Sequence, residues 1–258
     1  MDEYLQVAIE AAKEAGQILV EKMGKVGFRE KNPRDLVTDA DLASQAKIEH
    51  MVSERFPNHQ FCGEESGKSA VEIESEFAWV VDPLDGTTNF VHQLRSFSVS
   101  IALTQNKRPI VGVVYDPLLN ECFYATQNGG AFLNGQSIGV SNCQELNKAL
   151  VVTGFSTSVT KESIEAQRFL EMLGKAQTIR RLGSAALNLC YLGCGRVDAY
   201  WASNLNAWDI AAGMLIVEEA GGKVRPISGE FDLFQPNFIA SATEILGAEI
   251  FQTIDISE

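Results

Sequence analysis

Two aspartates, three positions apart, directly follow a short apolar run and give the clearest indication of chemistry in the chain. The run 77–81 has β character, and Asp82, Pro83, Leu84 and Asp85 come next. Because Pro83 has no N–H with which to continue a sheet, we expect the strand to end at Asp82 and the chain to turn there. Such a turn can direct both carboxylates and the Leu84 carbonyl at one point. An oxygen-only ligand set favours Mg²⁺.

The residues after the two aspartates are suited to binding an anion. Gly86 allows the backbone to approach a ligand closely, and Thr87 and Thr88 can begin a helix with exposed N–H groups. A lone pair of aspartates at this spacing usually only caps a turn. Here the glycine, the threonines and the preceding strand together favour a metal site beside a phosphate site.

Three further acidic segments can contribute to the same site. Glu64 follows a glycine in a loop, Asp41 lies where a helix begins, and Asp209 starts a later helix beside small residues that permit close packing. Singly, each is more often a helix cap or a solvated loop residue. Together with Asp82 and Asp85 they would form a cluster whose mutual repulsion requires cations.

Composition narrows the class of protein. The 258 residues are 45% hydrophobic, enough to bury a full core, and we expect a single domain over 1–258 with two lobes, about 1–145 and 146–258. Acidic residues outnumber basic ones by 34 to 21, and the formal charge of −13 makes nucleic acid an unlikely main partner. That charge also opposes an anionic metabolite unless a bound divalent metal reverses the sign locally.

The cysteines and histidines indicate the compartment and exclude one metal class. The five cysteines are scattered, with no C-x-x-C pair, which is typical of reduced thiols in a cytoplasmic protein. The three histidines stand apart from one another, so a zinc site of histidines has little support. No apolar run approaches the length needed to span a bilayer, and we expect no membrane association.

The elements that must position these residues follow from hydrophobic periodicity. Apolar residues at helical spacing predict helices over 3–23, 39–55, 161–173, 184–192, 207–220 and 243–253. Shorter runs predict strands over 77–81, 96–104, 110–115, 121–125, 151–152, 178–180 and 197–201. A turn-rich stretch over 31–34 and an acidic loop over 62–76 connect the first elements. Strong turns join the middle strands into an antiparallel meander, and the alternation that follows indicates a layered α/β or α+β architecture.

These motifs together resemble the inositol monophosphatase family, within the lithium-sensitive, metal-dependent sugar phosphatase superfamily. The matching segments cover nearly the whole chain in the family's order, and D-P-L-D-G-T-T is highly specific. They are D-L-V-T-x-x-D at 35–41, G-E-E at 63–65, D-P-L-D-G-T-T-N-F at 82–90, G-S-A-A at 183–186 and W-D-I-A-A-G at 208–213. The resemblance implies a layered αβαβα fold, with a mostly antiparallel first sheet and a second mixed sheet. It also implies a homodimer and two or three Mg²⁺ per active site.

The resemblance also assigns roles by position. The metals would be held by Glu64, Asp82, the Leu84 carbonyl, Asp85 and Asp209. Thr87 and Asp41 would help Glu64 to orient and deprotonate the attacking water. The substrate's phosphate and hydroxyl-bearing ring would contact Asp85, Gly86, Thr87, Gly183, Ser184, Ala185 and Asp209.

Two departures from the family pattern concern the substrate and the surroundings of the site. Inositol-specific members carry a glutamate seven residues before the W-D aspartate, where this chain has Ala202. Alanine cannot grip inositol hydroxyls, although Ser203, Asn204 or Asn206 could substitute. Gln45 stands where a glutamate often follows the Asp41 element, and we expect it to affect packing or outer polarity rather than chemistry.

Inositol monophosphate is the default substrate, with several alternatives open. Fructose bisphosphate, histidinol phosphate, 3′-phosphoadenosine 5′-phosphate and NADP suit the same metal core, and differ in the pocket around 154–160 and 181–206. Arg180, Arg181 and Lys161 could meet a second phosphate there, although surface solvation is the commoner role. An alternative of another class is a regulatory partner of the transcription machinery, as for some bacterial relatives. The acidic charge and the complete catalytic set make that alternative less attractive.

Overall fold

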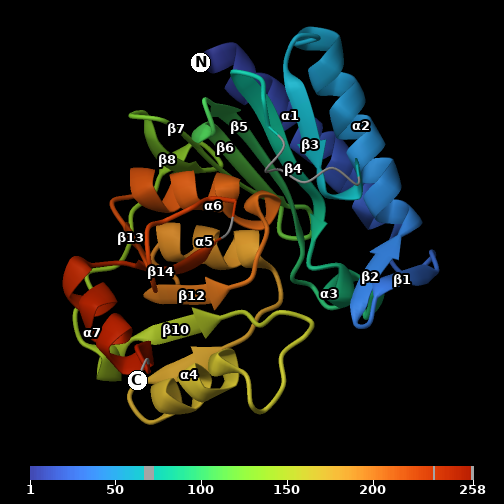
Figure 1. Ribbon diagram of the computed structural model, residues 1–258. Coiled ribbons are helices and arrows are strands. Elements are labelled where there is room, and N and C mark those ends of the chain that lie inside the picture. Colours follow the sequence, from blue (N-terminus) through green and yellow to red (C-terminus); the bar gives the residue numbers. More distant parts are fainter. Residues whose placement is uncertain (67–72, 235, 257–258) are drawn as a thin grey trace.

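The computed structural model describes residues 1–66, 73–234 and 236–256. The first two amphipathic segments form the predicted helices, α1 (Asp2–Lys22) and α2 (Asp39–Arg55). Their apolar residues pack against one face of a large sheet (Figure 1). No helix within the described ranges is long and apolar enough to cross a membrane.

The large sheet confirms the predicted meander. Its strands, in the described part of the chain, lie in the order β3-β4-β5-β6-β7-β8-β9. Every neighbouring pair is antiparallel except β3 and β4, which are parallel. The strands span Gln60–Gly63 (β3), Phe77–Asp85 (β4), Ser98–Gln105 (β5), Arg108–Asp116 (β6), Glu121–Thr126 (β7), Gly130–Leu133 (β8) and Gln136–Ser137 (β9). Part of the acidic loop predicted over 62–76 lies outside the described residues.

The second sheet is mixed, as expected. Its strands lie in the order β11-β10-β12-β14-β13, with β10 parallel to β11 and β12 and the other pairs antiparallel. The strands span Leu150–Thr153 (β10), Thr178–Arg180 (β11), Ala199–Ser203 (β12), Lys223–Pro226 (β13) and Asn237–Ser241 (β14). The helices of this half span Ile164–Leu173 (α4), Ala185–Gly193 (α5), Ala207–Glu219 (α6) and Glu244–Ile254 (α7).

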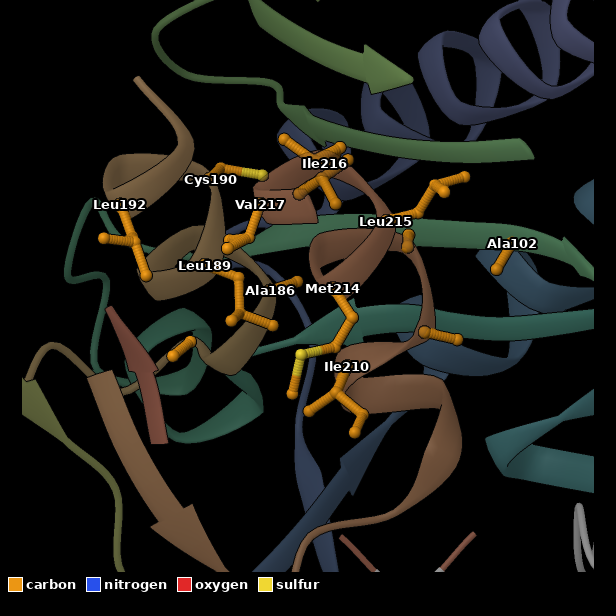
Figure 2. Packing of buried hydrophobic residues seen from close by; sticks show 14 of the residues in the cluster. Ala102, Ala186, Leu189, Cys190, Leu192, Ile210, Met214, Leu215, Ile216 and Val217 are labelled. Atoms are coloured by element: carbon orange, nitrogen blue, oxygen red, sulfur yellow. The ribbon is translucent and has the colours of Figure 1, made fainter. Parts of the chain in front are cut away.

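The layers follow the order α, β, α, β, α. Helices α1 and α2 cover the outer face of the large sheet, α5 and α6 lie between the two sheets, and α4 and α7 cover the outer face of the second (Figure 1). Figure 2 shows side chains of α5, such as Leu189, packed against those of α6, such as Ile210 and Met214. The predicted layered fold is therefore confirmed.

Helix α6 lies unusually close to its neighbours because small residues face it. A Cβ added at Gly112 of β6 would lie 2.7 Å from the Ala212 carbonyl oxygen, and one added at Gly213 would lie 2.6 Å from Leu189 Cβ. The backbone of α6 thus rests directly on that of β6. This close packing matters for function because α6 carries Asp209 in its first turn.

Several elements were not predicted. Strands β1 (Phe28–Asn32) and β2 (Asp35–Thr38) form a hairpin where the sequence suggested only a turn-rich stretch. All five residues of β1 are exposed, so hydrophobic alternation could not reveal it. Strands β3, β8, β9, β13 and β14 are also additional, each of them short. The division of the chain into one domain with two lobes stays a prediction.

Candidate active site

A bulge in β4 brings the two aspartates to the same side of the sheet. The prediction that the strand ends at Asp82 is wrong, since β4 continues to Asp85. Asp82 pairs with Ser100 and Asp85 with Ser98, so two residues of β4, Pro83 among them, lie opposite one residue of β5. This extra residue accommodates a proline inside the sheet. It also shifts the alternation by one, so both aspartates project from one face.

Asp85 joins this face to the start of α5. Its carboxylate accepts hydrogen bonds from the Ser184 hydroxyl (2.5 Å) and from the backbone N–H groups of Ala185 (3.1 Å) and Ala186 (2.8 Å). A longer contact comes from the Ser98 hydroxyl at 3.4 Å. Burial raises the pKa of Asp85, although these donors act in the opposite direction. The predicted substrate residues Ser184 and Ala185 therefore lie directly beside a predicted metal ligand.

Asp82 and Asp209 complete the group of carboxylates. Asp82 accepts a hydrogen bond from the Leu84 N–H (2.9 Å), and Asp209 accepts one from the Asn206 N–H (2.7 Å) at the start of α6. Burial raises the pKa of Asp82 far above its ordinary value, and the nearby charges of Glu64, Asp85 and Asp209 raise it further. Burial and then the charge of Glu64 do the same for the pKa of Asp209. Four of the predicted ligands thus interact electrostatically with one another.

Glu64 stands on the other side of the site, where a lysine already accompanies it. The Lys31 ammonium, from β1, lies 2.8 Å from Glu64 Oε1 and also contacts the Glu65 carboxylate. Burial alone would lower the pKa of Lys31, but the charges of the two glutamates raise it above its ordinary value. Burial raises the pKa of Glu64, while Lys31 opposes that shift. Sequence reasoning missed Lys31 because it lies in an exposed strand that shows no hydrophobic alternation and was not predicted.

Gln45 holds the segment that carries Glu64. Its side-chain carbonyl accepts a hydrogen bond from the Glu65 N–H (2.8 Å). A Cβ added at Gly63 would lie 2.3 Å from the same oxygen, so only glycine fits there without a shift. Gln45, which we expected to affect packing or outer polarity, therefore contacts the backbone of the segment that carries Glu64.

Asp41 and Thr87 meet as the resemblance implied. The Thr87 hydroxyl lies 3.2 Å from Asp41 Oδ1 and 3.0 Å from the Leu84 carbonyl oxygen, and it can donate to one of them at a time. The other Asp41 oxygen accepts from the N–H (2.8 Å) and hydroxyl (2.6 Å) of Thr38. Burial raises the pKa of Asp41, and the Thr38 donors work against that rise.

Two glycines at positive φ shape the site, one directly after β4 and one shortly before α5. Gly86 has φ +96° and precedes the short helix α3 (Thr87–Val91), and Gly183 has φ +90°. A Cβ at Gly183 would lie 2.7 Å from Asn89 Nδ2. Asn89 donates to the carbonyls of Ser96 (2.7 Å) and Leu182 (2.8 Å), and so ties these segments together. The family motif contained Asn89, but sequence reasoning gave it no role.

A cavity of about 170 Å³ adjoins the carboxylates. The predicted residues Asp85, Gly183, Ser184, Ala185 and Asp209 line it, whereas Gly86 and Thr87 are not among its lining residues. The rest of its wall consists of Thr153, Gly154, Phe155, Arg181, Asn188, Tyr200 and Leu205, and all of these except Thr153 fall within the ranges 154–160 and 181–206. At its edge the Arg181 guanidinium lies over the Phe155 ring, 5.6 Å from the centroid.

The donor set fits hard divalent cations. It consists of carboxylates and one backbone carbonyl, and the raised pKa values of the carboxylates reflect crowded charges removed from water. Among the described residues, no group of three acidic, histidine or cysteine side chains forms a ready-made cage. The Lys31 ammonium at Glu64 and the α5 donors at Asp85 use part of the acceptor capacity of these two carboxylates and leave the rest for a metal.

The chain matches a known protein family over nearly its full length. The model of the inositol monophosphatase family matches residues 1–257. The chain is 47% identical over 241 residues to "Inositol monophosphatase 2" of Solanum lycopersicum, covering 90% of this chain and 91% of that one. It is 39% identical over 259 residues to "Nus factor SuhB" of Pasteurella multocida, covering 98% and 96%.

A solved structure is similar over the full length. The extragenic suppressor protein suhB of Bartonella henselae superposes with a TM-score of 0.92 at 34% identity, covering 99% of this chain and 100% of that one.

Proposed function

Because the chain belongs to the inositol monophosphatase family of phosphatases, we propose that it is a Mg²⁺-dependent hydrolase of a small phosphate monoester. The first candidate substrate is inositol monophosphate, which would give inositol and phosphate. The observation that carries the proposal is the convergence of four carboxylates from three segments: Glu64 from the turn after β3, Asp82 and Asp85 from β4, and Asp209 from α6. Repulsion among these carboxylates destabilises the folded protein unless bound cations offset it.

The proposed cofactor is two or three Mg²⁺ per site, held by Glu64, Asp82, the Leu84 carbonyl, Asp85 and Asp209. When bound, Mg²⁺ would supply positive charge that activates the attacking water and stabilises the leaving oxygen. By family resemblance, millimolar lithium should inhibit the enzyme.

The chain's own residues would orient the reactants. We assign Glu64 to accept the proton of the attacking water, and Thr87 to hold that water in line with phosphorus. Asp41 would fix the Thr87 hydroxyl, which it already contacts at 3.2 Å. The N–H groups of Gly86 and Thr87 would bind the phosphate oxygens.

The rest of the substrate would lie against the start of α5. Gly183, Ser184 and Ala185, together with Asp85 and Asp209, line the cavity in which the hydroxyl-bearing ring would fit. We further propose that the chain works as a cytoplasmic homodimer.

A panel of phosphorylated metabolites tests this function. It should include inositol monophosphate, fructose bisphosphate, histidinol phosphate, 3′-phosphoadenosine 5′-phosphate and NADP, each with Mg²⁺ or with a chelator. We expect release of inorganic phosphate from at least one of them with Mg²⁺, and its loss on chelation or with millimolar lithium. If no compound of the panel releases phosphate in Mg²⁺, or if release is equal in the chelator, the proposal is rejected.

Ala202→Glu tests the proposed reason for any weak use of inositol monophosphate. Residue 202 lies two positions after Tyr200 in β12, on the strand face that borders the cavity, and a Cβ at Gly154 would lie 4.0 Å from Ala202 Cβ. A carboxylate there should raise kcat/KM for inositol monophosphate by roughly tenfold through contacts with the hydroxyls.

Ala202→Gln has the same length without the charge and is the matched control. Because Ala202 is 1% exposed, a thermal melt should establish that both variants fold. Unchanged or lower kcat/KM in Ala202→Glu, or an equal gain in Ala202→Gln, would contradict this account.

A second candidate function is suggested by the relative named a Nus factor. A role of this chain in transcription would be separate from hydrolysis. If it has that role, purification of the chain from its own cells should yield components of the transcription machinery with it. The same experiment on an Asp85→Asn variant would show whether that association needs the active site.

A further inference from the structure

The wall of the cavity beside the carboxylates contains a tyrosine that has no part in the motifs or in the proposed chemistry. Tyr200 lies in β12 and is 1% exposed. It lines the cavity of about 170 Å³ together with Asn188 of α5 and Gly154, which follows β10. Its ring packs edge-to-face against Phe238, with 5.4 Å between the ring centroids. The ring is therefore fixed in the core, while the residue as a whole borders the cavity.

The backbone at Gly154 leaves the space in front of the Tyr200 hydroxyl open. A Cβ added at Gly154 would lie 3.2 Å from the Tyr200 hydroxyl oxygen and 4.0 Å from Ala202 Cβ. The parallel pairing of Val152 with Tyr200 explains this proximity, because residues two positions apart in a strand share a face. Since Ala202 has no polar atom in its side chain, the Tyr200 hydroxyl is a hydrogen-bonding group that remains at this part of the wall.

The Tyr200 hydroxyl keeps its proton and has hydrogen-bonding capacity left. Burial raises the pKa of Tyr200, and a hydrogen bond from the Asn188 amide opposes that shift. The charges of Asp85 and Asp209 raise the pKa further, which places the hydroxyl within electrostatic reach of two predicted metal ligands. A phenolic hydroxyl can donate one hydrogen bond and also accept, so the contact with Asn188 does not exhaust it.

Asn188 is itself incompletely hydrogen-bonded. The residue is 2% exposed, and its side-chain oxygen Oδ1 has no hydrogen-bond partner within the described part of the chain. Buried polar atoms in folded proteins normally have a partner, and a polar pair kept only for packing should be fully hydrogen-bonded. The pair formed by Asn188 and Tyr200 therefore suits a ligand that supplies further hydrogen bonds.

We propose that Tyr200 is a specificity-determining residue whose hydroxyl binds a hydroxyl group of the substrate, with Asn188 as the positioning residue behind it. A hydroxyl group matches because it can both donate to Tyr200 and accept from it, whereas an ammonium group only donates and a carboxylate only accepts. This inference rests on the proposed hydrolysis and deepens it by naming the substrate class, a phosphate ester of a neutral polyol. Tyr200 then supplies a neutral contact where Ala202 supplies none.

Tyr200→Phe removes one oxygen atom and keeps the ring against Phe238. For inositol monophosphate in saturating Mg²⁺, we expect kcat/KM to fall by about tenfold, as for the loss of one neutral hydrogen bond. For propyl phosphate, which has no free hydroxyl, kcat/KM should not change. An equal loss for both esters would indicate a purely structural role, and no loss for either would indicate no contact. Each of these two results would overturn the proposal.

Tyr115→Phe is the matched control. The Tyr115 hydroxyl, in β6, lies 3.0 Å from Asn120 Oδ1, so this variant also removes a tyrosine hydroxyl that contacts a side-chain amide. Tyr115 does not belong to the wall of this cavity. Its variant should hydrolyse both esters as the parent does, and a selective loss like that expected for Tyr200→Phe would contradict the proposal.

Gly154→Ala tests the same contact without removing the hydroxyl. The added methyl group would lie 3.2 Å from the Tyr200 oxygen and cover it on the side of the cavity. We expect a selective loss of kcat/KM for inositol monophosphate over propyl phosphate. An unchanged ratio between the two esters would count against the proposal, and this variant decides if a thermal melt shows that Tyr200→Phe does not fold.

Free inositol separates a failure of this inference from a failure of the proposed function. Its binding to the full chain requires no hydrolysis, and as a neutral polyol it is not repelled by the carboxylates. We expect saturable shifts in the NMR signals of the Gly154 and Tyr200 amides, with a Kd about tenfold higher in Tyr200→Phe. If the parent hydrolyses no ester, the proposed hydrolysis is refuted and inositol binding decides alone. Absence of the shifts, or equal Kd values in the two proteins, would then overturn the inference.

Discussion

Asp85→Asn should reduce phosphate release by at least about a thousandfold, because it removes a negatively charged ligand from the metal site. Asp85 is also the acceptor for the first N–H groups of α5, so one side chain would hold both metal and the substrate-binding turn. The measurement is kcat/KM for the best substrate of the panel, at saturating Mg²⁺.

The fold of this variant should survive. An amide at position 85 would turn an N–H₂ group toward one of the donors from Ser184, Ala185 or Ala186, at a cost of about 1–3 kcal/mol. Removing one charge from the crowded carboxylates offsets part of that cost. Circular dichroism and a thermal melt should therefore show a folded protein.

Asp198→Asn is the matched control for the hydrogen bonds. Asp198 also accepts from a serine hydroxyl, Ser141 (2.5 Å), and from a backbone N–H, that of Leu150 (2.8 Å), but it lies outside the carboxylate cluster. This variant should lose stability and keep its activity. Near-normal activity of Asp85→Asn, or equal losses in both variants, would overturn the assignment of the site.

Removal of metal should destabilise the protein at pH 8 and do so much less at pH 5. Mg²⁺ at about 100 times its Kd adds about 2.7 kcal/mol, which corresponds to roughly 5–10 °C in Tm for a chain of this size. The pH dependence follows from the raised pKa values of Asp82, Asp85, Asp209 and Glu64.

The sign of the pH effect is fixed by proton binding. Because the folded, metal-free protein holds these protons more tightly than the unfolded chain, its stability falls as pH rises from the ordinary carboxyl pKa to the raised values. Bound Mg²⁺ offsets the repulsion between the ionised carboxylates, so the gap between metal-bound and metal-free protein should widen with pH.

Calorimetry between pH 5 and 8, with Mg²⁺ or a chelator, measures this gap, and choline chloride at equal ionic strength controls for screening. A Tm unaffected by chelation at every pH, or a gap that widens toward pH 5, would contradict the electrostatic account of the site.

Local patterns in the sequence predicted the long helices and the meander well, and they placed two acidic residues in the correct elements. Helices α2 and α6 place Asp41 and Asp209 in their first turns, and helical periodicity together with small residues was enough to locate both. The strand before Asp82 was recognisable from its dense apolar run. In each case the residues that form the pattern belong to a single helix or strand.

Features that depend on pairing between distant segments were not predictable. The bulge in β4 is defined by its pairing with β5, in which Asp82 lies opposite Ser100 and Asp85 lies opposite Ser98. The sequence of β4 alone does not contain this pairing. Lys31 reaches Glu64 from a hairpin with no buried residue in its first strand. A cavity lined by Arg168, Ser203 and Asn237 likewise requires α4, the end of β12 and β14 to come together.

The contact between Gly112 and Ala212 has a consequence for how such sequences can evolve. The nearest atoms to an added Cβ at 112 are backbone atoms of α6, so no exchange of side chains at 212 could make room for it. The helix itself would have to move, and Asp209, less than one turn earlier, would move with it. A side chain at position 112 is therefore expected to disturb the site, although Gly112 is not itself one of the predicted site residues.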